Sequence, residues 1–211
     1  MRRHFVHFLW GSLLAILGVI TVFFISVWNG WVGYMPNMDE LSNPIDKFAS
    51  QVYSSDQQLI GTWNADNNNR VAIDYNGLSP HLVHALVATE DERFYEHSGV
   101  DFIALGRAVV KRGVMGQASA GGGSTITQQL AKQLFSEKAH STVERLLQKP
   151  IEWIIAVKLE RHFTKEEILA MYFNYFDFLH NAVGIKRAAN VYFNKEPRKL
   201  TVTEAAMLVG L

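Results

Sequence analysis

Two short stretches of the chain hold residue types that could carry out a reaction together. The first, residues 89–99, gathers carboxylates at the end of an apolar helical pattern and contains Glu90, Asp91 and His97. The second, residues 121–132, is a glycine-rich turn that leads into a helical segment rich in hydroxyl and amide groups. A carboxylate can accept a proton, and the free N–H groups of a helix start can bind an anion. Together these groups suit a reaction between a sugar and a phosphate.

Glu90 is the first candidate for the proton acceptor. A helix is predicted to begin at Ser79 and Pro80, which suit the N-cap and the first helical position. Its apolar positions end with Leu86 and Val87, so Glu90 follows where the buried stripe gives way to charge. Partial shielding from water there would suit a general base. The alternative is a solvated acidic turn.

A second helix is predicted after the acidic cluster. Gly99 is expected to end the first helix, and Asp101 can cap the next one, from Phe102 to about Arg112. This next helix carries much apolar surface for its length. It is therefore expected to be a core helix, or to rest partly in the lipid headgroup region.

Three consecutive glycines open the second stretch and permit backbone geometry that other residues avoid. Ser124 is predicted to cap a helix over residues 125–135. Thr125, Gln129 and Lys132 are spaced i, i+4 and i+7, so they share one face of that helix. An anion site is predicted there, with pyrophosphate as an obvious ligand. The alternative is a flexible loop and a capped surface helix.

A further carboxylate, Glu152, follows Lys149 and Pro150, which are predicted to begin a helix that runs to Arg161. A proline at the first helical position and an acid in the first turn both favour a helix start. Helix stability alone would therefore explain the presence of Glu152.

Capping boxes predict two more helices near the end of the chain. One begins at Thr164 and continues through Tyr175, and the other begins at Thr201 and continues from Ala205 to Leu211. Because the sequence stops inside that last apolar helix, we expect it to be a fragment of a longer protein.

The N-terminal segment is predicted to cross a membrane. Phe5 to Trp28 contains no Asp, Glu, Lys or Arg, and His7 is its one titratable side chain; about 20 apolar residues suffice to span a bilayer. Arg2 and Arg3 place the short tail, residues 1–4, in the cytoplasm. The bulky residues that follow the apolar run argue against a cleaved signal peptide.

Residues 29–75 are predicted to be a linker with a small β segment. Three short and partly alternating runs predict a β hairpin or meander: Phe48–Tyr53, Gln58–Trp63 and Arg70–Tyr75. Its expected role is to pack the linker on the domain that follows, residues 76–211.

Composition excludes several classes of protein. Among the 211 residues, 48% are apolar, which suffices for a sizeable core, and the formal net charge is zero. A balanced charge gives no indication of nucleic-acid binding. The absence of cysteine excludes disulfides, thiolate catalysis and cysteine-ligated zinc.

Taken in order, these motifs resemble those of the peptidoglycan glycosyltransferases of family 51. This family comprises the monofunctional transglycosylases and the N-terminal domains of class A penicillin-binding proteins. The resemblance covers about residues 76–211. It rests on Glu90-Asp91 with Phe94 and His97-x-Gly99; Gly123-Ser124-Thr125-x-Thr127-Gln128-Gln129; Lys149-x-x-Glu152; Lys165-x-x-Ile168-Leu169-x-x-Tyr172-x-Asn174; Gly184-Ile185-x-x-Ala188-Ala189-x-x-Tyr192-Phe193-x-Lys195; and Leu200-x-x-x-Glu204-Ala205.

The resemblance implies a mainly α fold with a lysozyme-like lobe and a smaller lobe that touches the membrane. In this chain a small β hairpin and one transmembrane helix would precede it. The implied activity is polymerisation of lipid II into glycan strands by inverting transfer, with release of undecaprenyl pyrophosphate. The implied location is the cytoplasmic (inner) membrane, single-pass, with the catalytic domain on the extracytoplasmic side.

The resemblance also implies roles for individual residues. Glu90 would be the general base, and Glu152 a second carboxylate that places the pyrophosphate or a metal ion. No cofactor is required by this pattern, although a divalent cation, Mg²⁺ or Mn²⁺, is an optional component. Substrate-binding or supporting roles fall to Asp91, Phe94, His97, Ser124, Thr125, Gln128, Gln129, Lys132 and Lys149.

The sequence departs from the family pattern at two positions. Gln148 stands where the family usually has Arg, so one pyrophosphate cation is missing or is supplied by Arg145. Asn194 stands where Gly is usual, a mild change because Asn tolerates positive φ. We also expect a transpeptidase domain to follow Leu211 in the parent protein.

The expected partners are lipid II, the growing lipid-linked glycan and the membrane, with no nucleic acid, and membership of a cell-wall synthesis complex stays open. A lysozyme-like peptidoglycan hydrolase or lytic transglycosylase is the alternative function, because it too uses carboxylates. A non-catalytic membrane scaffold ranks third. For a scaffold of this kind, replacement of Glu90 by Gln would leave every activity unchanged.

Overall fold

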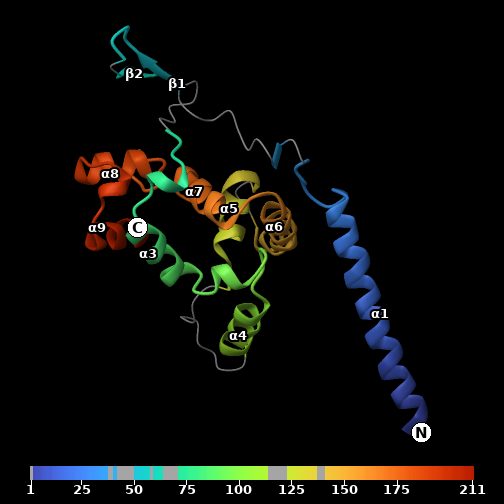
Figure 1. Ribbon diagram of the computed structural model, residues 1–211. Coiled ribbons are helices and arrows are strands. Elements are labelled where there is room, and N and C mark those ends of the chain that lie inside the picture. The colour runs from blue at the N-terminus through green and yellow to red at the C-terminus, as the bar shows by residue number, and fades with distance from the viewer. Residues whose placement is uncertain are drawn as a thin grey trace.

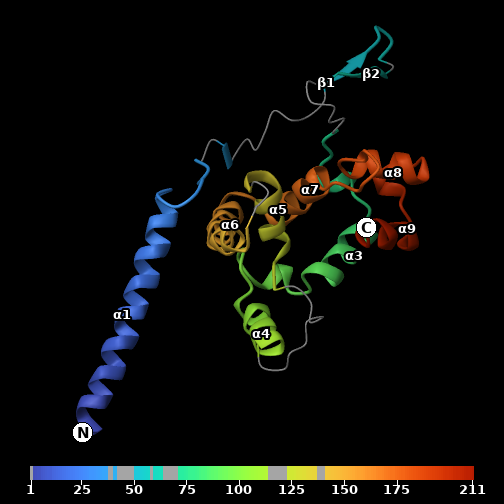
Figure 2. The same ribbon diagram turned by 180° about the vertical axis from the view of Figure 1, so that it is seen from behind.

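The computed structural model describes residues 2–37, 40–41, 50–57, 59–63, 71–113, 123–136 and 141–211. It is mainly helical, as predicted. Figures 1 and 2 show a body of packed helices, with one long helix standing beside it and a strand pair apart from it. The longer elements are α1 (Arg2–Trp28), β1 (Ser50–Tyr53), β2 (Leu59–Trp63), α3 (Pro80–Glu90), α4 (Phe102–Gly113), α5 (Ile126–Phe135), α6 (Thr142–His162), α7 (Lys165–Tyr175), α8 (Ile185–Phe193) and α9 (Val202–Val209).

Helix α1 is long and apolar enough to cross a membrane over His4–Trp28. Its far end also packs against α6. The ring of Phe24 stacks on that of Trp153 with 6.5 Å between centroids, and Lys158 Nζ lies 5.0 Å from the centroid of the Trp28 ring. Helix α1 is therefore joined to the body by side-chain contacts as well as by the chain.

The strands β1 and β2 pair antiparallel, in the first two of the three runs predicted to be β. The described part of the third run, residues 71–75, is not a strand, and Tyr75 begins a 3-10 helix, Tyr75–Gly77. It is held on α7 instead, because the side-chain amide of Asn174 binds both backbone groups of Ile73. A meander of three strands over these residues is therefore wrong.

The core lies among helices that are distant in sequence. Helix α5 packs against both α6 and α7, and α3 packs against α9. Their apolar faces meet in one cluster, which includes the fully buried residues Leu82, Phe94, Ile126, Leu130, Ile155, Leu159, Ile168, Leu169, Ala205 and Leu208. This cluster fixes the three helix ends on which the candidate site is built.

The predicted caps at four helix starts are confirmed. Ser79 caps α3, Asp101 accepts the first free amides of α4, and complete capping boxes begin α7 at Thr164 and α9 at Thr201. Asn194 ends α8 with φ 51°, as its tolerance of positive φ predicts.

Three helix ends differ from the prediction. Helix α3 ends at Glu90 and not at Gly99, because Asp91 leaves the helical conformation and forms contacts elsewhere. The cap of α5 is Thr125 and not Ser124. Helix α9 ends at Val209, with Gly210 as its cap, and does not continue to Leu211.

Helix α6 also begins earlier than predicted. Its cap is Ser141, whose side chain accepts the Glu144 N–H, and Pro150 lies inside the helix. The prediction took the proline for a first helical residue, where proline is most often found. Glu152 consequently lies in the middle of a long helix and not in its first turn.

Gly99 lies where two segments approach closely. Its φ is +92°, and an added Cβ would lie 2.8 Å from backbone atoms of Ala156 and Val157 in α6. Backbone atoms cannot move aside as a flexible side chain can. This close approach brings the Gly99 carbonyl to the start of α5, where it accepts the Thr125 hydroxyl at 2.7 Å.

We predict that Gly99→Ala lowers the free energy of unfolding by more than about 2 kcal/mol, through strain and overpacking. Thermal unfolding followed by circular dichroism measures it. Gly106→Ala is the matched control, because Gly106 lies in α4 with open space around it. There the change should be neutral or stabilising by up to about 1 kcal/mol. Equal melting temperatures for parent and Gly99→Ala would contradict the prediction.

Candidate active site

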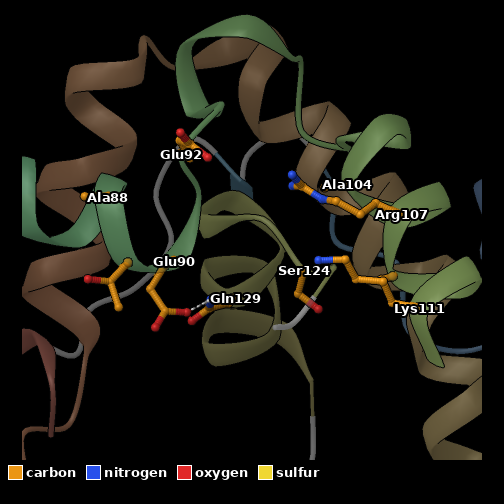
Figure 3. A pocket seen from close by; sticks show the side chains of 10 residues that line it. Ala88, Glu90, Glu92, Ala104, Arg107, Lys111, Ser124 and Gln129 are labelled. Carbon is orange, nitrogen blue, oxygen red and sulfur yellow. Dashed lines mark hydrogen bonds between the residues drawn. The ribbon is translucent and has the colours of Figure 1, made fainter. Parts of the chain in front are cut away.

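A cavity of about 490 Å³ lies between the end of α3, the start of α5 and one side of α4. Figure 3 shows Glu90 on one wall, with Arg107 and Lys111 reaching from α4 toward Ser124 and Gln129. The lining residues are Ala88, Thr89, Glu90, Glu92, Ala104, Arg107, Ala108, Lys111, Ser124 and Gln129. Two carboxylates, Glu90 and Glu92, and two cations, Arg107 and Lys111, therefore line one cavity that opens to the surface.

Glu90 reaches this cavity from the last position of α3. Its side chain is exposed, so the expected shielding from water is not observed. Gln129 Nε2 donates to Glu90 Oε2 at 2.7 Å, and the Tyr172 hydroxyl donates to Gln129 Oε1 at 3.1 Å. The carboxylate is thus held by its amide partner and not by burial.

Asp91, the next residue, is buried and joins three segments. Its Oδ2 accepts the Ile126 N–H at 3.0 Å, and both of its oxygens lie within 3.1 Å of His97 Nε2. Among the described residues, His97 Nδ1 is buried and lacks a hydrogen-bond partner. The proton of a neutral His97 therefore belongs on Nε2, where it can be donated to Asp91.

Backbone amides at the start of α5 form hydrogen bonds with side chains of the protein. Asp91 occupies its first amide, and Thr125 accepts the Gln128 N–H at 3.2 Å. Thr125 and Gln128 are both buried, and both donate to the carbonyl of Gly99. Two amides of the helix start predicted to bind an anion, those of Ile126 and Gln128, are consequently taken by internal groups, and the buried Thr125 does not share an open face with Gln129.

Glu152 is buried beneath a lysine. Its side chain is 3% exposed, and its Oε2 accepts Lys149 Nζ at 2.6 Å. Lys149, 41% exposed, also donates to Ser124 Oγ at 3.2 Å, and Ser124 lines the cavity. Glu152 therefore holds a cation at the edge of the cavity and is not itself presented to it.

The remaining predicted residues lie outside the cavity lining. Phe94 is fully buried, with Lys165 Nζ 4.2 Å from its ring centroid. Lys132 is exposed in the last turn of α5. Lys165 also binds Glu160 at 2.6 Å and the His97 carbonyl at 2.8 Å, which ties the loop after α3 to α6 and α7.

Residues 56–211 match the model of the transglycosylase family. The chain belongs to this family. It is 43% identical over 143 residues to penicillin-binding protein 1F of Bacillus subtilis, a match that covers 68% of this chain and 19% of that protein. It is 37% identical over 202 residues to penicillin-binding protein 1A of Aquifex aeolicus, covering 95% of this chain and 26% of that protein.

A third relative, penicillin-binding protein 1A of Escherichia coli, is 37% identical over 177 residues, covering 84% of this chain and 20% of that protein. The matched part spans 19% to 26% of the length of these three relatives. The family resemblance inferred from the motifs is confirmed.

Two cations that line the cavity, Arg107 and Lys111, were not among the residues predicted from the sequence. Arg107 and Lys111 are four residues apart in α4, and both line the cavity. The spacing i, i+4 could have indicated one shared face, but the apolar content of this segment pointed to a core helix instead. Phe102, Ile103 and Val109 are in fact exposed.

Burial and nearby charges shift the pKa of two side chains close to the cavity, Tyr172 and Asp101. Burial, and then the nearby charge of Glu90, raise the pKa of Tyr172 above its usual range. Burial alone would raise the pKa of Asp101, but two helix amides and the Arg93 guanidinium hold it below its usual value. Tyr172 therefore remains a donor to Gln129, and Asp101 remains a charged cap for α4.

The raised pKa of Tyr172 predicts a loss of stability at high pH. Above the ordinary value of 10.0 the unfolded chain loses this proton while the folded protein keeps it, so the free energy of unfolding falls as pH rises. Tyr172→Phe lacks this contribution. The difference in melting temperature between parent and variant should therefore stay constant up to about pH 9 and narrow above about pH 10. A difference that stays constant at every pH would contradict the assignment.

Proposed function

We propose that this protein is a membrane-anchored peptidoglycan glycosyltransferase that polymerises lipid II into glycan strands. The observation that carries the proposal is the cavity in which Glu90 faces Arg107 and Lys111. Membership of the transglycosylase family supports it, as do relatives that are penicillin-binding proteins. The activity proposed is that of the domain, since this chain spans a fraction of those relatives.

Glu90 acts as the general base in this proposal. Its carboxylate takes the proton of the acceptor sugar 4-hydroxyl while that oxygen attacks the anomeric carbon of the donor. The bond from that carbon to the pyrophosphate oxygen breaks on the opposite face, so the configuration inverts. The electron pair of the broken bond leaves with the lipid pyrophosphate. An exposed carboxylate held at one oxygen by Gln129 is accessible to such an acceptor.

The leaving pyrophosphate gathers negative charge, which cations stabilise. Arg107 and Lys111 lie across the cavity from Glu90, and Lys149 reaches its edge through Ser124. Glu152 positions Lys149 for this task. Asp91 and His97 act indirectly, because they hold α3 against α5.

The described residues do not by themselves form a site for a divalent cation. Among them, no group of three His, Asp or Glu side chains could hold a metal ion. Glu152, the predicted metal contact, is buried and already paired with Lys149. No step of the proposed reaction therefore passes through a metal.

The proposed location follows from the anchor. Arg2 and Arg3 precede α1, and the positive-inside rule then places the N-terminus in the cytoplasm. The cavity would face the extracytoplasmic side of the cytoplasmic membrane. Its proposed partners are lipid II and the growing glycan, with other proteins of a cell-wall synthesis complex.

We predict that Glu90→Gln lowers the rate of polymerisation of labelled lipid II by at least about 100-fold, because a general base is lost. The detergent-solubilised full chain is assayed by gel separation of the glycan products. Glu166→Gln is the matched control, since Glu166 is an exposed glutamate outside this cavity. Its rate should equal that of the parent.

Other outcomes would redirect the assignment. Equal rates for the parent and Glu90→Gln would move the base to another residue. Release of soluble sugars from finished glycan, without any lipid-linked substrate, would instead favour a hydrolase.

We further predict that Arg107→Gln and Lys111→Gln each lower kcat/KM by about 10-fold or more, because each removes a charge-assisted contact to the pyrophosphate. Arg198→Gln on the exposed turn before α9 is the control. Steady-state rates at several lipid II concentrations measure the effect. Unchanged kcat/KM in both variants would contradict the proposed role of Arg107 and Lys111 in binding the pyrophosphate.

A further inference from the structure

We propose that Tyr172 is a positioning residue for the base, acting on Glu90 through the side-chain amide of Gln129. This inference rests on the proposed function, in which Glu90 accepts the proton. It concerns a residue outside the cavity lining that touches neither the substrate nor the reacting carboxylate. Its effect on the reaction passes through one amide group.

Three side chains from three helices form the chain of contacts. Tyr172 of α7 donates to Gln129 Oε1 at 3.1 Å, and Gln129 of α5 donates to Glu90 Oε2 at 2.7 Å at the end of α3. Tyr172 is 3% exposed, Gln129 is partly buried and Glu90 is exposed. The contacts therefore lead from the core to the surface of the cavity.

The Tyr172 hydroxyl, the buried donor, determines which way the side-chain amide of Gln129 is turned. A carboxylate only accepts hydrogen bonds, so the Gln129 amide must turn its NH₂ group toward Glu90. Its carbonyl oxygen then needs a donor on the other side, and the Tyr172 hydroxyl is that donor. With the amide reversed, two oxygens would face each other at the carboxylate and the NH₂ group would face a hydroxyl.

The position of the Tyr172 hydroxyl is itself fixed by packing. Its ring stacks on Phe176 with centroids 5.4 Å apart, and it meets the edge of Phe173 at 5.9 Å. The raised pKa of Tyr172 keeps the hydroxyl protonated at any working pH. The Tyr172 hydroxyl is therefore held in one position and stays protonated.

This arrangement distinguishes the two oxygens of Glu90. Gln129 engages Oε2, so Oε1 is the oxygen assigned to the acceptor hydroxyl. A carboxylate free to rotate would present Oε1 in the reactive position for only part of the time. Positioning of this kind affects the reaction step more than substrate binding, and so affects kcat more than KM.

The test is a double-mutant cycle on lipid II polymerisation with Tyr172→Phe, Gln129→Ala and the double variant. We expect Tyr172→Phe to lower kcat about 3- to 10-fold with little change in KM, as one lost hydrogen bond implies. Because the hydroxyl acts through Gln129, the double variant should be no slower than Gln129→Ala. Losses that multiply, or a Tyr172→Phe variant with the parent's kcat, would overturn the inference.

Tyr192→Phe separates positioning from a loss of stability. This hydroxyl also bonds inside the protein, to the Phe178 carbonyl at 2.7 Å, but it lies on α8 and outside the cavity lining. The variant should keep the parent's kcat whatever its melting temperature. A kcat that follows melting temperature across both tyrosine variants would assign a merely structural role to Tyr172.

A parent chain without polymerase activity would refute the proposed function, and a second readout then decides the inference. The side-chain amide signals of Gln129 in ¹H–¹⁵N NMR spectra report the two hydrogen bonds directly. Tyr172→Phe should shift them and speed their exchange with water, whereas Tyr192→Phe should not. Unchanged Gln129 signals in Tyr172→Phe would overturn the inference independently of any activity.

Discussion

The carboxylate of Asp91 holds three segments of the molecule in one arrangement. It accepts the Ile126 N–H at the start of α5 and lies within 3.1 Å of His97 Nε2, while its own backbone ends α3. A buried carboxylate tolerates few rearrangements, because the loss of a donor leaves a desolvated charge without a partner. The end of α3 and the start of α5 are therefore tied together. Glu90, one residue before Asp91, and Gln129, one turn after Ile126, are brought face to face as a consequence.

The same carboxylate determines where positive charge is found in the cavity. The partial positive charge of a helix start is a natural site for a phosphate, but in α5 an internal carboxylate already occupies it. The negative charge of a substrate has to meet side-chain cations instead. Arg107 and Lys111 come from α4, and Lys149 comes from α6, where Glu152 orients it. The carboxylate and the cations thus belong to different helices, and the packing of the core sets their separation.

Features that depend on neighbouring residues could be predicted from the sequence, and features that depend on distant contacts could not. The caps at Ser79 and Thr164 follow from a few adjacent side chains, and the sequence predicts them correctly. The importance of Glu90 came from the family motifs, since its position at a helix end fits a solvated turn equally well. The burial of Thr125 depends on the carbonyl of Gly99, and nothing near Thr125 in the sequence indicates that partner.

If α1 anchors the domain in a membrane, as proposed, the contact between α1 and α6 lowers the entropic cost of meeting a membrane-bound reactant. A domain joined to its anchor only by the chain could adopt many tilts above the bilayer, and each productive encounter would have to select one of them. Stacking of Phe24 on Trp153, and of Lys158 on Trp28, restricts those tilts as the protein folds. The entropy of selecting one orientation is then lost when the protein folds, and it is not lost again at each encounter with the reactant. A helix packed in this way would fix the orientation of the domain at the membrane, and would not only hold the domain near it.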